Sequence, residues 1–214
     1  MYINLHTHKP VKGNVMAIRN VFNDFANHPK TFFSAGLHPW YITEEWPNHF
    51  MLLEKAVSNS HALAIGECGL DRTCITNWSM QQQAFAEQVI LANNTGKPLI
   101  IHCVRAHEEI LQMLLKLQNR QTVIFHGYNR NWNMAEKILG SGQWLSFGKG
   151  LEQLQVQEVF FQTPVDRFFL ETDDSDMEIE KIYELAADVK SMPMHELIMQ
   201  LQFNFEKVFK IPVR

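Results

Sequence analysis

The sequence has few cysteines and no long apolar run. Its three cysteines, Cys68, Cys74 and Cys103, form no C-x-x-C pair. This odd, scattered set argues against a disulfide framework and favours free thiols in a reducing compartment. No apolar stretch reaches the roughly 18 residues that a membrane helix needs. Because the N-terminal MYINLHTHKP lacks a basic segment followed by an apolar one, we expect a cytoplasmic protein without a signal peptide and without membrane contact.

The sequence also lacks a surplus of positive charge. It has 19 Lys and Arg against 23 Asp and Glu, a net charge of −4. That balance argues against a surface built to coat nucleic acid broadly, but it permits a small nucleic-acid site whose positive charge comes from metal ions. No linker or low-complexity tract divides the chain, and no obligate protein partner is evident. We therefore expect residues 1–214 to form one compact domain.

Short apolar runs alternate with longer helical patterns along the whole chain. The runs ALAIG, PLIIH and TVIFH are almost continuously apolar, which is typical of parallel strands covered on both faces. The second strand segment could instead begin a helix. Eight strands alternating with helices predict an α/β fold, a (β/α)8 TIM barrel with short loops. The strands are expected at residues 2–6, 14–20, 31–37, 62–66, 98–102, 122–126, 143–148 and 167–173. The helices are expected at residues 48–60, 77–96, 105–120, 131–142, 151–162, 179–190 and 194–209.

Metal-ligand side chains follow five of these strands. Ten histidines are present, and one by itself after an apolar strand is more often structural than catalytic. The combination is more informative, because the carboxyl ends of barrel strands meet on one face, where active sites lie. Burying several imidazole and carboxylate groups together would be costly unless bound cations compensated that cost. The six side chains in question are His6, His8, Glu67, His102, His126 and Asp173.

Six such groups exceed what one catalytic ion with an open position uses, so we expect two ions. In the partition we favour, His6, His8 and Asp173 hold one ion, His102 and His126 hold the other, and Glu67 bridges them. Imidazole and carboxylate without thiolate suit Zn, Mn, Fe or Co. Two such ions activate a water for hydrolysis, and Asp173 would orient this water and accept its proton. The pair alone does not distinguish phosphodiester from amide or ester.

A set of motifs spread over the chain resembles the TatD family of metal-dependent hydrolases, within the amidohydrolase superfamily. They are HTH (6–8), GLHPW (36–40), GECGLD (66–71), LIIHCVRA (99–106), FHGY (125–128), LSFG (145–148), LETD (170–173) and NFEKVF (204–209). The resemblance implies a TIM barrel, DNase activity and a centre of two divalent ions (Zn, Mn or Mg). It places metal ligands at the six residues named above, with Glu67 and Asp173 also catalytic. It also suggests that His38 in GLHPW and Arg105 lie near substrate phosphate.

Two local features differ from the family pattern. Arg105 is displaced by one position from the usual H-x-R spacing after His102. The stretch after Asp173 is acidic, which suits a long polyanion poorly. It therefore keeps open a second hypothesis, an enzyme that cleaves a small amide, lactone or ester.

The alternative for His38 is a hydrogen bond within its own loop before Pro39. A binding module that has lost catalysis is a third reading, against which the intact ligand set argues.

Overall fold

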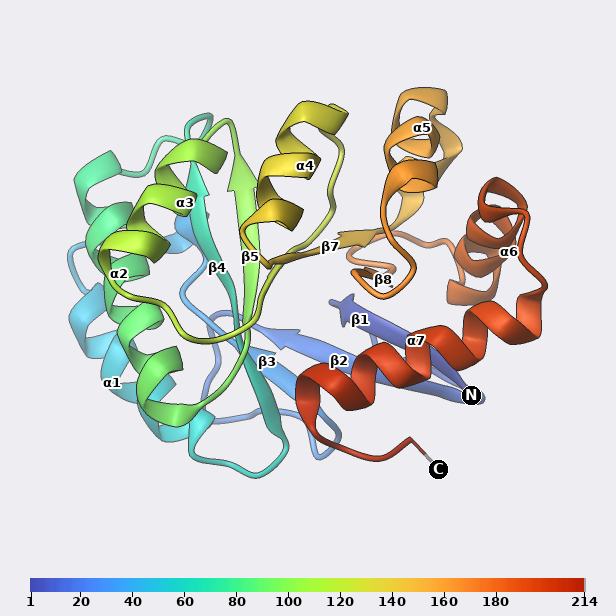
Figure 1. The fold of residues 1–214 in the computed structure, drawn as a ribbon. Coiled ribbons are helices and arrows are strands. Elements are labelled where there is room, and N and C mark those ends of the chain that lie inside the picture. The colour runs from blue at the N-terminus through green and yellow to red at the C-terminus, as the bar shows by residue number, and fades with distance from the viewer. Residues whose placement is uncertain (214) are drawn as a thin grey trace. The chain divides into compact units, whose positions relative to one another are not determined.

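The computed structural model describes residues 1–213, in which eight strands alternate with helices (Figure 1). The strands are β1 (Tyr2–Thr7), β2 (Val15–Val21), β3 (Phe33–Ala35), β4 (Ala62–Asp71), β5 (Leu99–Val104), β6 (Val123–Phe125), β7 (Trp144–Phe147) and β8 (Phe168–Leu170). The α-helices are α1 (Trp46–Val57), α2 (Trp78–Thr95), α3 (His107–Lys116), α4 (Trp132–Gly140), α5 (Leu154–Gln162), α6 (Ile179–Lys190) and α7 (Met194–Phe209). Two short 3-10 helices are η1 (Pro39–Tyr41) and η2 (Lys149–Glu152).

Every strand expected from the sequence is present, and the strand order in the sheet follows the chain from β1 to β8. The residues fall into two compact units. The terminal unit comprises residues 1–18 and the described residues from Phe125 onward, and the central unit comprises residues 19–124. One domain over 1–214 stays a prediction, and residue 214 lies outside the described residues.

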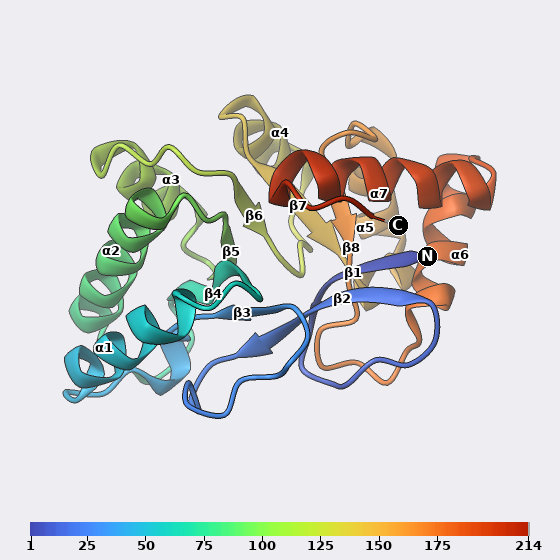
Figure 2. The same ribbon diagram turned by 90° about the horizontal axis from the view of Figure 1, so that it is seen from below.

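The central unit contains parallel strands covered by helices. β3 pairs with β2 on one side and with β4 on the other, and β4 pairs in turn with β5. Helices α1, α2 and α3 lie side by side along one face of these strands (Figures 1 and 2). Residues 62–65 of β4 and 99–101 of β5 are buried. Burial on both faces explains why these segments are continuously apolar rather than alternating.

The terminal unit has an aromatic core. Phe147 of β7, Phe160 of α5 and Phe168 of β8 meet edge to face, with ring centres 5.0 Å apart for Phe147 and Phe160 and 4.6 Å apart for Phe160 and Phe168. Buried Tyr183 of α6 donates its hydroxyl proton to the Ile3 carbonyl and accepts from the Ile3 amide, both at 3.0 Å. These contacts anchor β1, whose far end carries two predicted metal ligands.

The predicted end of the fourth strand was wrong. The sequence placed it at Gly66, where the apolar run ALAIG stops. The structure continues β4 to Asp71, with every residue buried. The register with β5 shifts between Ile65 and Cys68 and then continues to Asp71. Glu67 therefore lies inside a strand, at an irregularity of its ladder, and not beyond the end of the strand.

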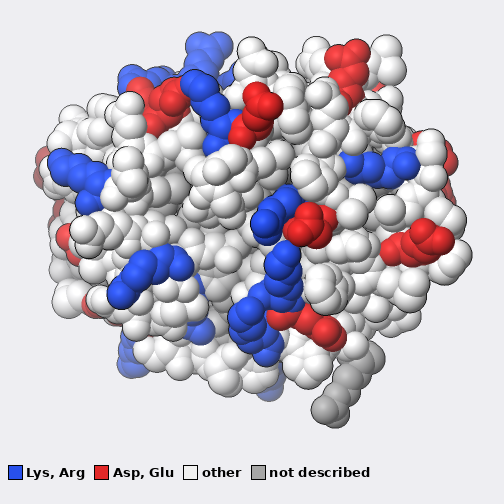
Figure 3. Space-filling view, in the orientation of Figure 1, with Lys and Arg blue, Asp and Glu red and all other residues white. Residues whose placement is uncertain are grey.

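Every helix among residues 1–213 is too short or too polar to span a bilayer. The three cysteines form no disulfide, as the sequence predicts. On the face shown in Figure 3, basic and acidic side chains are interspersed rather than separated by sign.

Candidate metal centre

Backbone hydrogen bonds join the end of β1 to the segment after β8. The His8 amide donates to the Asp173 carbonyl at 3.1 Å, and the Asp173 amide donates to the His6 carbonyl at 2.9 Å. Beside this pairing, buried Asn4 donates to Thr172 Oγ1 at 2.8 Å and accepts from the Thr172 amide at 3.1 Å. His6 lies in β1 and His8 directly follows it, and this register brings both imidazoles to Asp173.

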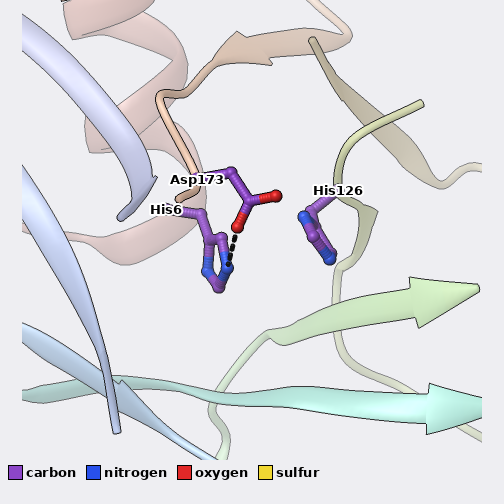
Figure 4. A group of neighbouring side chains, drawn as sticks. All are labelled: His6, His126 and Asp173. Carbon is purple, nitrogen blue, oxygen red and sulfur yellow. Dashed lines mark ion pairs between the residues drawn. The ribbon is translucent and has the colours of Figure 1, made fainter. Parts of the chain in front are cut away.

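Asp173 and three imidazoles form the cluster of the terminal unit. Asp173 Oδ1 is 3.5 Å from His6 Nε2 and 3.3 Å from His8 Nε2. The His126 ring, just after β6, has its centre 4.5 Å from that of His6. Figure 4 shows His6, His126 and Asp173 grouped together, and one ligand atom from each lies within 4.8 Å of the others. The terminal unit thus gathers four of the six predicted ligands.

The imidazoles keep the Asp173 carboxyl ionised. Burial raises its pKa, but the hydrogen bonds from His6 and His8 and the nearby charge of His126 outweigh burial. The net result is a pKa well below the usual range of an aspartate. An ionised carboxylate at neutral pH is the form that binds a cation.

A second cluster lies in the central unit around Glu67. Its Oε1 is 3.0 Å from His38 Nε2 and 2.9 Å from His102 Nδ1. Ligand atoms of these three side chains lie within 4.8 Å of one another. Buried Asn20 of β2 holds Glu67 at two points, because its amide group donates to Glu67 Oε2 and its carbonyl accepts from the Glu67 backbone amide, both at 3.0 Å. Asn20 thereby fixes the carboxylate at the irregular point of β4.

Asp71 contacts the other side of His102. Its Oδ2 is 3.1 Å from His102 Nε2 and accepts from Trp40 Nε1 at 2.6 Å, while its Oδ1 accepts from the Thr73 amide at 2.7 Å. Burial raises the pKa of this carboxyl, but the hydrogen bonds from Thr73, Trp40 and His102 outweigh burial and hold the pKa well below its usual range. His102 therefore lies between two carboxylates.

The substrate residues suggested by the resemblance lie in different surroundings. His38 is buried and caps η1, because its Nδ1 accepts from the Trp40 amide at 3.1 Å. The loop hydrogen bond weighed as its alternative is thus present, and the other ring nitrogen faces Glu67. Arg105 follows β5 and is exposed, with a positive φ of 53°. Within the terminal unit His126 lies beside His6, and the favoured partition that pairs His126 with His102 stays a prediction.

Three buried residues of these clusters were not identified from the sequence. Asn20 and Asp71 are described above, and Glu171, two residues before Asp173, contacts His126. Asp71 and Glu171 do stand inside quoted motifs, GECGLD and LETD. The sequence indicates which side chains lie at the end of a strand. It does not indicate which side chains of distant segments contact the candidate ligands.

The chemistry of both clusters fits divalent metal ions. Each combines imidazole nitrogens with a carboxylate within the span that one ion bridges, a donor set that suits Zn or Mn. Cys68, next to Glu67, does not join its cluster. Burial and the charge of Glu67 raise the pKa of the Cys68 thiol, which lies 3.8 Å from the Ile100 carbonyl. A buried protonated thiol is a poor ligand, so the donors are nitrogen and oxygen.

A cavity of about 350 Å³ adjoins the terminal-unit cluster. Glu171 and Asp173 form part of its wall, together with Asn129 and exposed Lys149. Its volume accommodates a small ligand. A molecule in this cavity would lie beside Asp173 and within reach of a lysine ammonium.

Acid should destabilise the metal-free protein through Asp71 and Asp173. A carboxyl whose pKa is lower in the folded protein than in the unfolded chain stabilises the fold above the unfolded value of about 3.9. That contribution disappears as the pH falls below this value toward the folded pKa. With a chelator present, we expect the urea concentration at the unfolding midpoint to decrease as the pH falls below about 4. In the double variant Asp71→Asn/Asp173→Asn this decrease with pH should be smaller. An equal dependence of the midpoint on pH in both proteins would contradict the assignment.

Comparisons with known proteins agree with the motif resemblance. The family model described as TatD related DNase matches residues 11–210. An uncharacterized metal-dependent hydrolase of Haemophilus influenzae is 28% identical over 157 residues, 69% of this chain and 60% of that protein. A 3'-5' ssDNA/RNA exonuclease TatD of Erwinia billingiae is 27% identical over 207 residues, 84% of this chain and 77% of that protein. The crystal structure of YJJV, a TatD homolog from Escherichia coli K12, has a TM-score of 0.87 at 20% identity, covering 99% of this chain and 98% of that one.

The similarity to that solved structure concerns the fold. Together with eight strands in sequential order, alternating with helices, it confirms the predicted α/β class and the (β/α)8 TIM barrel.

Proposed function

The chain belongs to the TatD related DNase family and is a metal-dependent hydrolase, and on that premise we propose that it cleaves phosphodiester bonds in DNA or in short nucleotides. The observation that carries the proposal is the cluster of His6, His126 and Asp173 beside a cavity with Lys149 in its wall. A hydrolytic centre next to a cation suits an anionic ester. The exonuclease name of the Erwinia relative supports a nucleic-acid substrate.

We further propose two divalent ions, Zn, Mn or Mg, one at each cluster. His6, His8 and Asp173, with His126 beside them, would hold one ion, and Glu67 with His102 would hold the other. Bound there, the ions would supply Lewis acidity toward the phosphoryl oxygen and an activated water. The protein supplies deprotonated carboxylates and a buried surround that strengthens these interactions.

The protein's own side chains orient the reactants. Asp173, kept ionised by its imidazole neighbours, accepts a hydrogen bond from the attacking water and then its proton. Lys149, in the wall of the cavity, would attract phosphate through its positive charge, and Arg105 keeps its predicted role near phosphate. His38 donates to Glu67, so we assign it the orientation of that carboxylate in addition to the predicted role near phosphate.

A substrate panel tests this function. The purified protein, stripped of metal and reloaded with Mn²⁺ or Mg²⁺, is assayed on bis-p-nitrophenyl phosphate, on single-stranded DNA and on a series of lactones. We expect phosphodiester hydrolysis that a chelator abolishes and added metal restores. Elemental analysis of protein purified without chelator should find two equivalents of a divalent ion. Lactone turnover without phosphodiester turnover would instead establish the small-ester hypothesis.

A further inference from the structure

Glu171 contacts a candidate metal ligand, His126. Its side chain is buried, and its Oε1 accepts from the Gly127 amide at 2.7 Å and lies 3.2 Å from His126 Nδ1. Its Oε2 has no hydrogen-bond partner among residues 1–213. His126 and Gly127 are neighbours in the chain, directly after β6. A single oxygen atom, Glu171 Oε1, therefore contacts both the His126 ring and the Gly127 backbone amide.

The direction of this hydrogen bond follows from the Gly127 contact. Oε1 already acts as an acceptor, because it receives the Gly127 N–H, and its remaining lone pair faces His126 Nδ1. His126 Nδ1 must then be the donor and bear the hydrogen. In a neutral ring, the lone pair is left on Nε2.

Asp71 imposes the opposite choice on His102. Both Asp71 oxygens face N–H donors, of Trp40 on one side and Thr73 on the other. The carboxylate is therefore an acceptor on both sides, and His102 Nε2, 3.1 Å from Oδ2, must carry a hydrogen. This leaves Nδ1, 2.9 Å from Glu67, as the nitrogen that can bind a metal ion.

We propose that Glu171 and Asp71 are positioning residues that select the metal-binding nitrogen of a histidine, so that His126 binds through Nε2 and His102 through Nδ1. A ligand imidazole whose second nitrogen donates to a carboxylate is held in one tautomer and one orientation, and is a stronger base toward the metal. The proposal rests on the metal centre of the proposed function but not on its substrate.

Nitrogen NMR tests the proposal on the unaltered protein. Protein labelled with ¹⁵N-histidine and loaded with Zn²⁺ gives separate shifts for protonated and metal-bound ring nitrogens. We expect a protonated Nδ1 at His126 and a protonated Nε2 at His102, assigned with His126→Ala and His102→Ala. The same tautomer in both rings, or failure to take up zinc, would overturn the proposal. Expected tautomers in a protein without phosphodiesterase activity would refute only the substrate.

Zinc affinity tests the role of Glu171 separately. Glu171→Gln keeps an oxygen acceptor for both donors and can place its NH₂ at the unpartnered Oε2 position, so it should fold. It should weaken zinc binding less than Glu171→Ala, which should cost about 10-fold to 100-fold. In a His126→Ala background, Glu171→Ala should have no further effect, because the histidine through which Glu171 acts is gone.

Glu152→Gln is the matched control, since Glu152 lies on the same cavity but is exposed. It should leave zinc affinity unchanged. If Glu171 only supported the loop at Gly127, its variants would lower thermal stability while zinc affinity and the His126 tautomer stayed as in the wild type. That result would overturn the positioning role.

Discussion

Replacing Asp173 with asparagine should lower kcat/KM on a phosphodiester by about 10³-fold or more while the fold persists. The carboxylate lies against His6 and His8 and is our candidate for the proton acceptor. Asparagine has the same shape but cannot accept a proton or offer a negative charge to a cation. It also tolerates the positive φ of 53° at this position, so the circular dichroism spectrum should stay near that of the wild type. The rate is measured with saturating Mn²⁺.

Asp188→Asn is the control for this substitution, because Asp188 is exposed on α6. It removes one negative charge of the protein without touching either cluster and should leave kcat/KM within about twofold of the wild type. Full activity of Asp173→Asn would refute the assigned role. An equal loss in both variants would mean that overall charge, not the site, governs the rate.

Replacing Gly69 with alanine should lower the free energy of unfolding by about 3–5 kcal/mol. Gly69 pairs with His102 between β4 and β5, at a φ of +140°. A Cβ there would lie 2.0 Å from the His102 carbonyl oxygen. The strands must separate to admit it, which strains the backbone and moves His102 away from Glu67. We therefore also expect weaker zinc binding, measured by competition with a chromophoric chelator.

Gly140→Ala makes the same change in a permissive place. Gly140 ends α4, and a Cβ built on it meets nothing within 4 Å. This variant should be neutral or up to about 1 kcal/mol more stable, because alanine restricts the unfolded chain. If the denaturation curves of Gly69→Ala and Gly140→Ala coincide, β4 does not lie as close to β5 at Gly69 as the structure shows.

Local patterns predicted much of the fold. The helices predicted at 179–190 and 194–209 are confirmed with the same bounds as α6 and α7. Their apolar residues recur at helical spacing, which places them on one face of each helix that can be buried. Asn77 caps α2 by accepting from the Met80 amide, and Gly96 ends that helix in the left-handed conformation. Each signal lies within a few residues, so it can be read without knowledge of the partners.

Contacts between distant segments were beyond these patterns. The continuation of β4 past Gly66 depends on a partner strand more than thirty residues away, β5, whose register resumes at Cys68. The clamp of Asn20 on Glu67 joins residues 47 positions apart. Neither the length of a strand beyond a glycine nor the partner of a buried amide has a local signature.

The sequence already determined the order of the alternating strands and helices. It also determined which histidines and acidic residues follow the apolar runs, because residue type and spacing are sufficient to specify both. The tertiary structure alone decided how those side chains are grouped and oriented. It brings His126 to His6 and Asp173, and turns His38 toward Glu67. The buried carboxylates of Asp71 and Glu171 acquire their importance in the same way, because a hydrogen bond exists only where a donor and an acceptor from separate segments meet at about 3 Å.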